Sequence, residues 1–189
     1  MKKYKVLFTD LDGTLIDTVS GDTFPKGIWD MRFRFDVLDA INELEPLCVL
    51  IVTNQGGIEK GFVNRRNFEF KMEYITRSIK EYVGCYTEYS YCESNNKANH
   101  YRKPNTGMLE SMMTRCLKHL FRPDNLTKDD CLMIGDASGK EGQFSDSDKK
   151  TAENFGIDYL DAEDFINKMK ILRNEIDSFI DYLEKEETK

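Results

Sequence analysis

Hydrophobic and polar positions alternate along this chain in blocks of two kinds. Short apolar runs that end in polar residues predict buried strands, and apolar residues spaced three or four apart predict amphipathic helices. The predicted strands are residues 5–10, 48–54, 87–93, 131–136 and 157–161. The predicted helices between them are residues 36–45, 64–82 and 104–120. This alternation predicts an α/β fold: a mostly parallel sheet with helices on both faces.

The last part of the chain is highly charged but carries an apolar seam. Its members, four and three positions apart in turn, are Phe165, Met169, Leu172, Ile176, Phe179 and Leu183. This spacing fits one amphipathic helix folded onto its own domain, which we favour because the seam is short, or the interface of a dimer. We therefore divide the chain into a main domain, residues 1–166, and a C-terminal amphipathic helix extension, residues 167–189.

The first predicted strand ends in two carboxylates, in the segment KVLFTDLDGTLIDT. Asp10 and Asp12 would repel each other there unless they share a proton or bind a cation. Mg²⁺ suits them, because it prefers one or two carboxylates together with phosphate oxygens and water. One carboxylate can then attack phosphorus, and the other can protonate the leaving alkoxide. Gly13 permits the sharp turn. A simple turn with capping aspartates remains the alternative for this segment alone.

Two other predicted strands also end in polar residues, which parallel pairing would bring to the same edge of the sheet. Thr53 and Asn54 can bind phosphate oxygens, and Asp136 suits a metal ion. In the segment YRKPNTG, Lys103 can neutralise charge between a nucleophile and a phosphate, with Arg102 beside it. Each signal is weak alone, but their order favours a site for phosphoryl transfer.

Composition narrows the class of protein. The chain has 189 residues and a net charge of −7, so contact with nucleic acid would need a local patch. Its five cysteines are scattered and odd in number, which argues against a disulfide framework. No apolar stretch approaches the roughly 20 residues that cross a bilayer. We expect a cytoplasmic protein, nuclear if eukaryotic, with no membrane partner.

The motifs DLDGT, TN, RKP and GD…D resemble, in order, those of the haloacid dehalogenase (HAD) superfamily of aspartate-nucleophile phosphatases. DGTLIDTVSGDTFPKG, VTNQGGIEKG, YRKPNTGM and IGDASGK…FSDSDKKTAENFGI resemble the 3′-phosphatase domain of the polynucleotide kinase 3′-phosphatase family, over residues 5–166. The resemblance implies a Rossmann-like HAD fold without a large cap domain. It also implies a Mg²⁺-dependent phosphatase that removes the 3′-phosphate from nucleic-acid ends, DNA rather than RNA, through an aspartyl-phosphate.

The resemblance further implies a role for each motif residue. Asp10 would be the nucleophile and Asp12 the general acid and base, with Thr53 and Lys103 assisting catalysis. The implied Mg²⁺ ligands are Asp10, the backbone carbonyl of Asp12, Asp136 and Asp148, with Asp146 as a rival to Asp148. The implied phosphate- or substrate-binding residues are Gly13, Thr14, Asn54, Arg102 and Lys140. Lys140 departs from the family pattern, which has an arginine there, and lysine lacks the planar fork for bidentate contact.

Two other functions compete with this hypothesis. One is a small-molecule phosphatase resembling the histidinol-phosphate and heptose-bisphosphate enzymes, which carry a zinc loop before their Arg-Lys-Pro. Here that region offers only Cys85, Cys92 and His100, whereas structural zinc usually takes four ligands. The other is a catalytically silent binding module or scaffold that uses the C-terminal helix. The retained Asp10 and Asp12 argue against it.

The motifs of the chain also indicate which proteins and ligands it would work with. The chain contains no G-x-x-x-x-G-K-[ST], so a 5′-kinase, like a ligase, would be a separate partner. Binding of a nucleic-acid end needs local cations and aromatic surfaces. The candidates are Phe24, Trp29, Lys60, Arg65, Arg66, Lys97, His100, Tyr101 and Arg102. Packing into the domain is the alternative for Trp29, and capping or decorating a helix is the alternative for Arg65 and Arg66.

Overall fold

A computed structural model describes residues 2–22, 25–119 and 126–187, and places all five predicted strands in one parallel sheet. The sheet order is β5-β4-β1-β6-β7. The strands are β1 (Val6–Thr9), β4 (Cys48–Asn54), β5 (Tyr86–Cys92), β6 (Cys131–Gly135) and β7 (Asp158–Asp161). β1 lies in the middle, paired with β4 on one side and β6 on the other, so its carboxyl end opens at the centre of the sheet edge.

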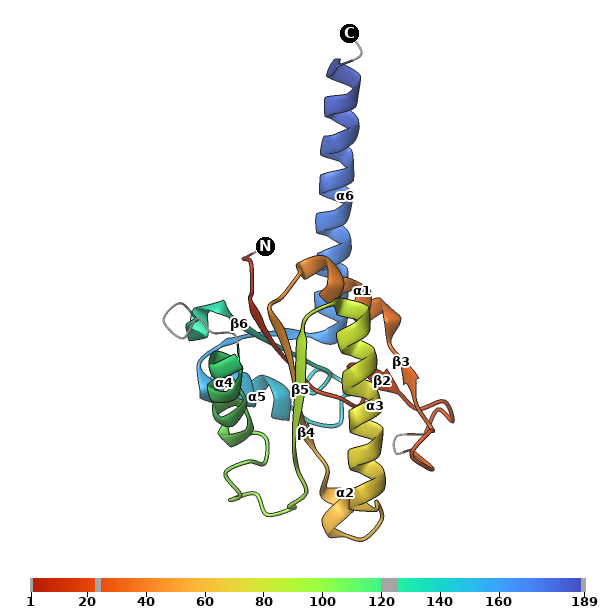
Figure 1. Ribbon diagram of the computed structural model, residues 1–189, viewed down its shortest axis with the longest axis vertical. Helices are drawn as coiled ribbons and strands as arrows, with labels where there is room; N and C mark the ends of the chain where they lie inside the picture. The colour runs from red at the N-terminus through yellow and green to blue at the C-terminus, as the bar shows by residue number, and fades with distance from the viewer. Residues whose placement is uncertain (1, 23–24, 120–125, 188–189) are drawn as a thin grey trace.

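Helices cover both faces of the sheet (Figure 1). One face carries α1 (Phe35–Leu44), α3 (Arg65–Val83) and the start of α6 (Ala162–Glu187); the other carries α4 (Gly107–His119) and α5 (Ser147–Phe155). Alternate β1 residues face the two cores: Leu7 packs with the first group, Val6 and Phe8 with the second. The predicted α/β fold is therefore confirmed. The helix expected from residue 104 begins at Gly107, and α5 was not predicted.

A small hairpin follows the Asp10–Asp12 segment and lies against α3 (Figure 1). Its strands, β2 (Ile16–Asp17) and β3 (Arg32–Phe33), pair antiparallel. Two short helical turns, α2 (Gly56–Glu59) and η2 (Lys128–Asp130), complete the described elements. None of the helices in the described part of the chain is long and apolar enough to cross a membrane.

The C-terminal helix α6 divides into a packed and a projecting part. Phe165 and Met169 are buried against the main core, whereas Ile176 and Phe179 are 58% and 61% exposed. Figure 1 shows the second half extending away from the sheet. The expectation that the whole seam folds onto its own domain is therefore wrong beyond the first turns. The helix also begins before the residue 166 boundary and runs through it.

Candidate active site

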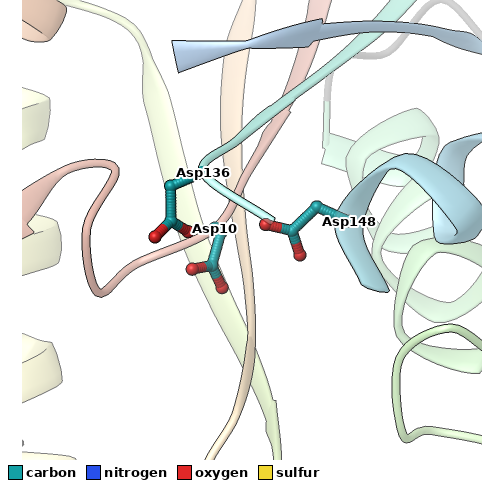
Figure 2. Close-up of side chains that lie close together, drawn as sticks. All are labelled: Asp10, Asp136 and Asp148. Atoms are coloured by element: carbon teal, nitrogen blue, oxygen red, sulfur yellow. The ribbon is translucent and has the colours of Figure 1, made fainter. Parts of the chain in front are cut away.

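Three carboxylates meet at the carboxyl edge of the sheet. Asp10 directly follows β1, Asp136 follows β6, and Asp148 comes from the first turn of α5 (Figure 2). One carboxylate oxygen from each lies within 4.8 Å of the others. We call these residues the acid triad. β1 and β6 are adjacent parallel strands, so their ends meet, but Asp148 arrives only because α5 packs against β6.

Lys103 provides a cation inside the acid triad. Its Nζ lies 2.5 Å from Asp10 Oδ1 and 2.7 Å from Asp148 Oδ1, and the residue is only 4% exposed. Burial lowers the pKa of Lys103, but the charges of Asp10 and Asp148 outweigh burial, so its net pKa is raised. Lys103 therefore stays charged, and its ammonium lies at the end of β1.

Charge and space at the triad both fit a divalent cation. When all three carboxylates are ionised, the one ammonium leaves two negative charges uncompensated in a largely buried site. Burial and the charges of Asp148 and Asp136 raise the pKa of Asp10 well above its ordinary value, although the charge of Lys103 opposes this shift. Burial and the charge of Asp148 raise the pKa of Asp136 to about 6. Such shifts mark carboxylates that need a counter-ion. Oxygen-only donors of this number suit Mg²⁺.

Two glycines leave space for the carboxylates of the triad because they have no Cβ. Gly13 has φ of +79°, and a Cβ there would lie 2.3 Å from Asp136 Oδ2. A Cβ at Gly135 would lie 2.2 Å from Asp148 Oδ2. Both distances are below any ordinary contact, so the triad needs glycine at these positions. Sequence reasoning singled out Gly13 for its turn but missed Gly135, whose role depends on the arrival of α5.

Asp12 lies beside the triad, and a glutamine holds its carboxylate. Gln55 Nε2 donates to Asp12 Oδ2 at 2.8 Å and to Thr53 Oγ1 at 3.1 Å. One amide thus fixes Asp12 and buried Thr53 relative to each other. Gln55 was not singled out from the sequence, although it directly follows the TN motif. Arg34, also missed, donates to the Gly13 carbonyl at 3.0 Å and so supports the same turn.

The structure distinguishes the two acids of the fourth motif. Asp148 is 1% exposed, accepts a hydrogen bond from the Ala137 N–H and belongs to the triad. Asp146 instead forms an ion pair with Lys150 at 2.6 Å, where both side chains are about half exposed. The arrangement thus places Asp148, and not Asp146, where a shared ion could be bound.

With the site's geometry established, the comparisons with known proteins identify its relatives. Residues 5–166 match the family described as Polynucleotide kinase 3 phosphatase. The chain belongs to this family. The match extends from the strand that carries Asp10 to the first turns of α6, so it covers all members of the triad.

Curated relatives of the chain include viral and cellular proteins. A protein of Autographa californica nuclear polyhedrosis virus, described only as an uncharacterized 20.8 kDa protein, is 30% identical, with 87% of each chain aligned. A bifunctional polynucleotide phosphatase/kinase of Schizosaccharomyces pombe is 31% identical over 87% of this chain, which spans 38% of that protein. A D-glycero-D-manno-heptose-1,7-bisphosphate 7-phosphatase of Chlorobaculum tepidum is 25% identical over 66% of each chain.

Solved structures confirm the HAD fold. A HAD-like protein from Mesorhizobium loti aligns with a TM-score of 0.62 at 20% identity, covering 88% of this chain and 84% of that one. The heptose 1,7-bisphosphate phosphatase of B. bronchiseptica, solved with magnesium and phosphate, aligns with a TM-score of 0.56 at 19% identity, covering 90% and 99%.

Three residues implied by the family resemblance lie differently from the expected phosphate contacts. Asn54 donates to the Lys103 carbonyl and accepts from the Lys103 N–H, both at 3.0 Å, so its amide positions Lys103. Arg102 donates to the Ser94 carbonyl at 2.8 Å. Thr14 is fully buried, and its hydroxyl has no hydrogen-bond partner among the described residues.

Lys140 pairs with two carboxylates in this structure. Its Nζ lies 2.7 Å from Asp164 and 3.2 Å from Asp161, near the start of α6. These two carboxylates compensate its charge, and a contact between Lys140 and a phosphate stays a prediction.

A zinc loop of the kind expected for the histidinol-phosphate and heptose-bisphosphate enzymes is not assembled here. Buried Cys92 contacts the Ser94 carbonyl, while His100 contacts Glu110. Within the described ranges, the acid triad is the only group of three side chains arranged to hold a metal ion.

Proposed function

We propose that this chain is a Mg²⁺-dependent phosphatase that removes the 3′-phosphate from nucleic-acid ends, DNA rather than RNA. The observation that carries the proposal is the acid triad closed by Lys103 at the carboxyl end of β1. Family membership supports the substrate class, because the family description and two curated relatives name polynucleotide phosphatases.

In the first step, a carboxylate oxygen of Asp10 attacks phosphorus. The bond from phosphorus to the 3′ oxygen breaks, and the leaving oxygen takes the proton of Asp12. Asp10 is well placed for this role because the fixed end of β1 aims it at the edge of the sheet and Lys103 contacts it directly. The product is a 3′-hydroxyl end and a phosphate covalently bound to Asp10.

In the second step, water is the attacking group. Asp12, now a carboxylate, takes a proton from water, whose oxygen attacks the phosphorus. The bond between phosphorus and Asp10 breaks, and inorganic phosphate leaves. Gln55 keeps the Asp12 carboxylate in one orientation, and its contact with Thr53 sets Thr53 beside the same space.

Mg²⁺ would be held by Asp10, Asp136 and Asp148, with the backbone carbonyl of Asp12 as a further ligand, and would neutralise phosphoryl oxygens. Lys103 adds a fixed positive charge on the same side. Positioned charge of this kind is the main source of catalysis in phosphoryl transfer.

A second candidate function is hydrolysis of a small phosphate ester, because curated relatives include heptose-bisphosphate and histidine-biosynthesis proteins. In this chain, residues 93–106 form a loop held by hydrogen bonds of Asn95 and Asn105. The described residues of this loop do not form the cluster of metal ligands that a zinc loop of those enzymes needs. This observation favours the polynucleotide branch. The silent-scaffold alternative conflicts with the intact triad.

Phosphate release distinguishes these functions. The substrates are a 3′-phosphorylated DNA oligonucleotide, its RNA and 5′-phosphorylated counterparts, histidinol phosphate, a heptose bisphosphate and an aryl phosphate. We expect Mg²⁺-dependent release with the highest kcat/KM on 3′-phosphorylated DNA. A higher kcat/KM on histidinol phosphate or the heptose bisphosphate would overturn the proposed substrate. No release from any of them would favour the scaffold.

The projecting part of α6 suggests a partner, and we propose that it is the same part of a second copy. The exposed apolar residues Ile176, Phe179 and Leu183 continue the seam along this part of the helix. Pairing with the seam of a second copy would cover these side chains. A 5′-kinase or ligase acting on the same ends would be another partner.

A further inference from the structure

Six aromatic side chains form a continuous surface beside the active site. The hairpin side contributes Trp29, Phe33 and, at the start of α1, Phe35; α3 contributes Phe70, Tyr74 and Tyr82. We call these residues the aromatic stripe. Trp29 contacts Phe70 and Tyr74 with ring centroids 6.0 and 5.5 Å apart, and Phe33 links Tyr74 to Phe35, which reaches Tyr82.

The stripe is exposed to solvent. Trp29, Phe35 and Phe70 are each more than half exposed, and Tyr74 is 46% exposed. The rings meet edge to face or tilted. Contiguous exposed apolar surface of this kind marks a binding surface more often than single exposed residues do.

The loop that carries Trp29 is fixed by its neighbour. The Asp30 carboxylate accepts hydrogen bonds from the Ser20 N–H, the Ser20 hydroxyl and the Lys26 N–H, at 2.7 to 2.8 Å. These bonds, the Lys26 bond above all, lower the pKa of Asp30 to about 2, so it stays ionised and keeps the loop closed. Trp29 is thereby held against α3 before any ligand arrives, which lowers the entropic cost of binding.

Cations without acidic partners lie along the stripe. Arg66 and Arg77 share the face of α3 that carries Phe70 and Tyr74, since they follow its three- and four-residue spacing. Both are exposed, and neither forms an ion pair with a described residue. Lys71 is 5% exposed and likewise has no hydrogen-bond or ion-pair partner among the described residues.

Lys71 connects the stripe to the catalytic edge. Burial lowers its pKa, and the two carboxylates whose charges oppose this shift are Asp12 and Asp30. One is the proposed acid and base; the other anchors the Trp29 loop. The hairpin itself begins at the Asp12 turn, where Asp12 bridges to Ile16. The stripe therefore starts next to the place where the 3′-phosphate would react.

We propose that the aromatic stripe, with Arg66 and Arg77, binds the single-stranded nucleotides that precede the 3′-phosphate. The bases stack on the exposed rings, and the backbone phosphates approach the unpaired cations. This inference rests on the proposed function and extends it: the triad acts on the terminal phosphate, while the stripe selects a polymer over a small ester. Stacking tolerates any base sequence, so the selection is for a strand.

The chemistry of the stripe favours a nucleic-acid strand over a protein partner. The whole chain has a net charge of −7, so its attraction to a polyanion must come from places where cations lack acidic partners. Aromatic rings interleaved with such cations are the combination that single strands need. A protein partner would not require a path that begins at the reacting phosphate.

Fluorescence offers a direct test, because Trp29 is the single tryptophan of the chain. The probe is an oligothymidylate of about ten nucleotides with a 3′-phosphate, titrated into the full-length Asp10→Asn variant so that no turnover occurs. We expect stacking to quench the Trp29 emission in a saturable manner. Thymidine 3′-phosphate, which is too short to reach the stripe, should quench less. Unchanged emission at saturating oligonucleotide would overturn the proposal.

Kinetics on active protein provides the second test. Trp29→Ala, Phe70→Ala and Tyr74→Ala should each raise the KM for the oligonucleotide at least about fivefold, with a smaller change for an aryl phosphate. Phe179→Ala is the matched control, because it removes an equally exposed ring from the distant part of α6. Circular dichroism would verify that each variant folds.

The outcomes separate this inference from the proposed function. If thymidine 3′-phosphate and the oligonucleotide react with equal kcat/KM and the stripe variants change neither, the 3′-phosphatase stands and the stripe proposal fails. The same result is expected if the stripe binds another protein. If neither nucleotide reacts and a heptose bisphosphate does, the proposed function itself fails.

Discussion

The acid triad and the aromatic stripe depart from the usual distribution of charged and apolar residues in opposite ways. The triad places charge where water is excluded: Asp10 and Asp148 are at least nine-tenths buried. The stripe places apolar surface where water is present: Trp29 is 53% exposed. Burial of charge demands a counter-ion, and exposure of apolar surface demands a cover. Each region thus indicates, by its mismatch with its surroundings, the kind of ligand it needs.

The difference also indicates the size of the effects. Groups in a buried, pre-arranged charge cluster act on the reacting atoms, so their loss affects rate by orders of magnitude. Exposed rings contribute through binding, where single substitutions cost a few-fold to about a hundredfold. The following predictions test this contrast, in decreasing order of expected effect.

Asp10→Asn tests the buried cluster most strongly. We expect kcat to fall at least about 10⁴-fold, because an amide cannot form the covalent bond to phosphorus. Phosphate release from an aryl phosphate measures this loss without involving the stripe. Asp146→Asn is the matched control, because Asp146 lies in the same motif but outside the triad, and it should retain nearly full activity. Substantial turnover by Asp10→Asn would show that another group attacks.

Lys103→Met removes the one cation inside the triad. We expect a loss of about 10²- to 10³-fold in kcat, as for other preorganised charge stabilisers. The variant should also be destabilised in the absence of metal, since Asp10 and Asp148 then lose the buried ammonium that pairs with both of them. Thermal melts with and without Mg²⁺ measure this, and Mg²⁺ should raise the melting temperature more in the variant than in the parent. Equal shifts would mean that Lys103 and the ion do not share the same carboxylates.

Binding of Mg²⁺ should weaken as the pH falls. The pKa of Asp136 is raised to about 6 in the metal-free site, so below that pH the ion must displace a proton. Between pH 7.5 and pH 5 we expect the affinity to drop about tenfold or more, since Asp10 also has a raised pKa. Isothermal titration calorimetry at both pH values, with proton release followed in two buffers, measures this drop. A pH-independent affinity would place the ion away from Asp136.

The projecting part of α6 is exposed apolar surface like the stripe, but it lies far from the chemistry. Phe179→Glu should convert a dimer into a monomer, because it places a charge in the middle of the seam. Light scattering coupled to size-exclusion chromatography measures the mass. The kcat on an aryl phosphate should change less than twofold, in contrast to the triad variants. Asp181→Asn, on the same part of α6 but off the seam, serves as the control. A parent protein that is monomeric at all concentrations would contradict the proposed pairing of two α6 seams.

Much of the fold and half of the site follow from the sequence. The strands that carry Asp10 and Asp136 are continuous apolar runs, and parallel pairing must bring their ends to one edge. The first turn of α5 carries the third acid, but its pattern is short and polar, so the sequence left two acids of that motif as candidates. Only the packing of α5 against β6 brings Asp148 inward and leaves Asp146 outside.

Some expected phosphate contacts could not be judged from motifs at all. Asn54 and Lys140 are the residue types that bind phosphate, yet their side chains are engaged with the Lys103 backbone and with Asp161 and Asp164. These partners lie between 21 and 49 positions away in the sequence, so no local pattern indicates them. The prediction that the whole C-terminal seam packs onto its own domain was wrong for the same reason. The spacing of apolar residues defines an apolar face of a helix but does not indicate what covers that face.

The sequence by itself determined the periodicity of each element, the order of the motifs and the residues able to carry charge, because these depend on local chemistry. The tertiary structure alone decided which charges share a site, which rings join into one surface and where α6 leaves the domain. Those are contacts between distant segments, and their geometry is set by how helices pack on the sheet.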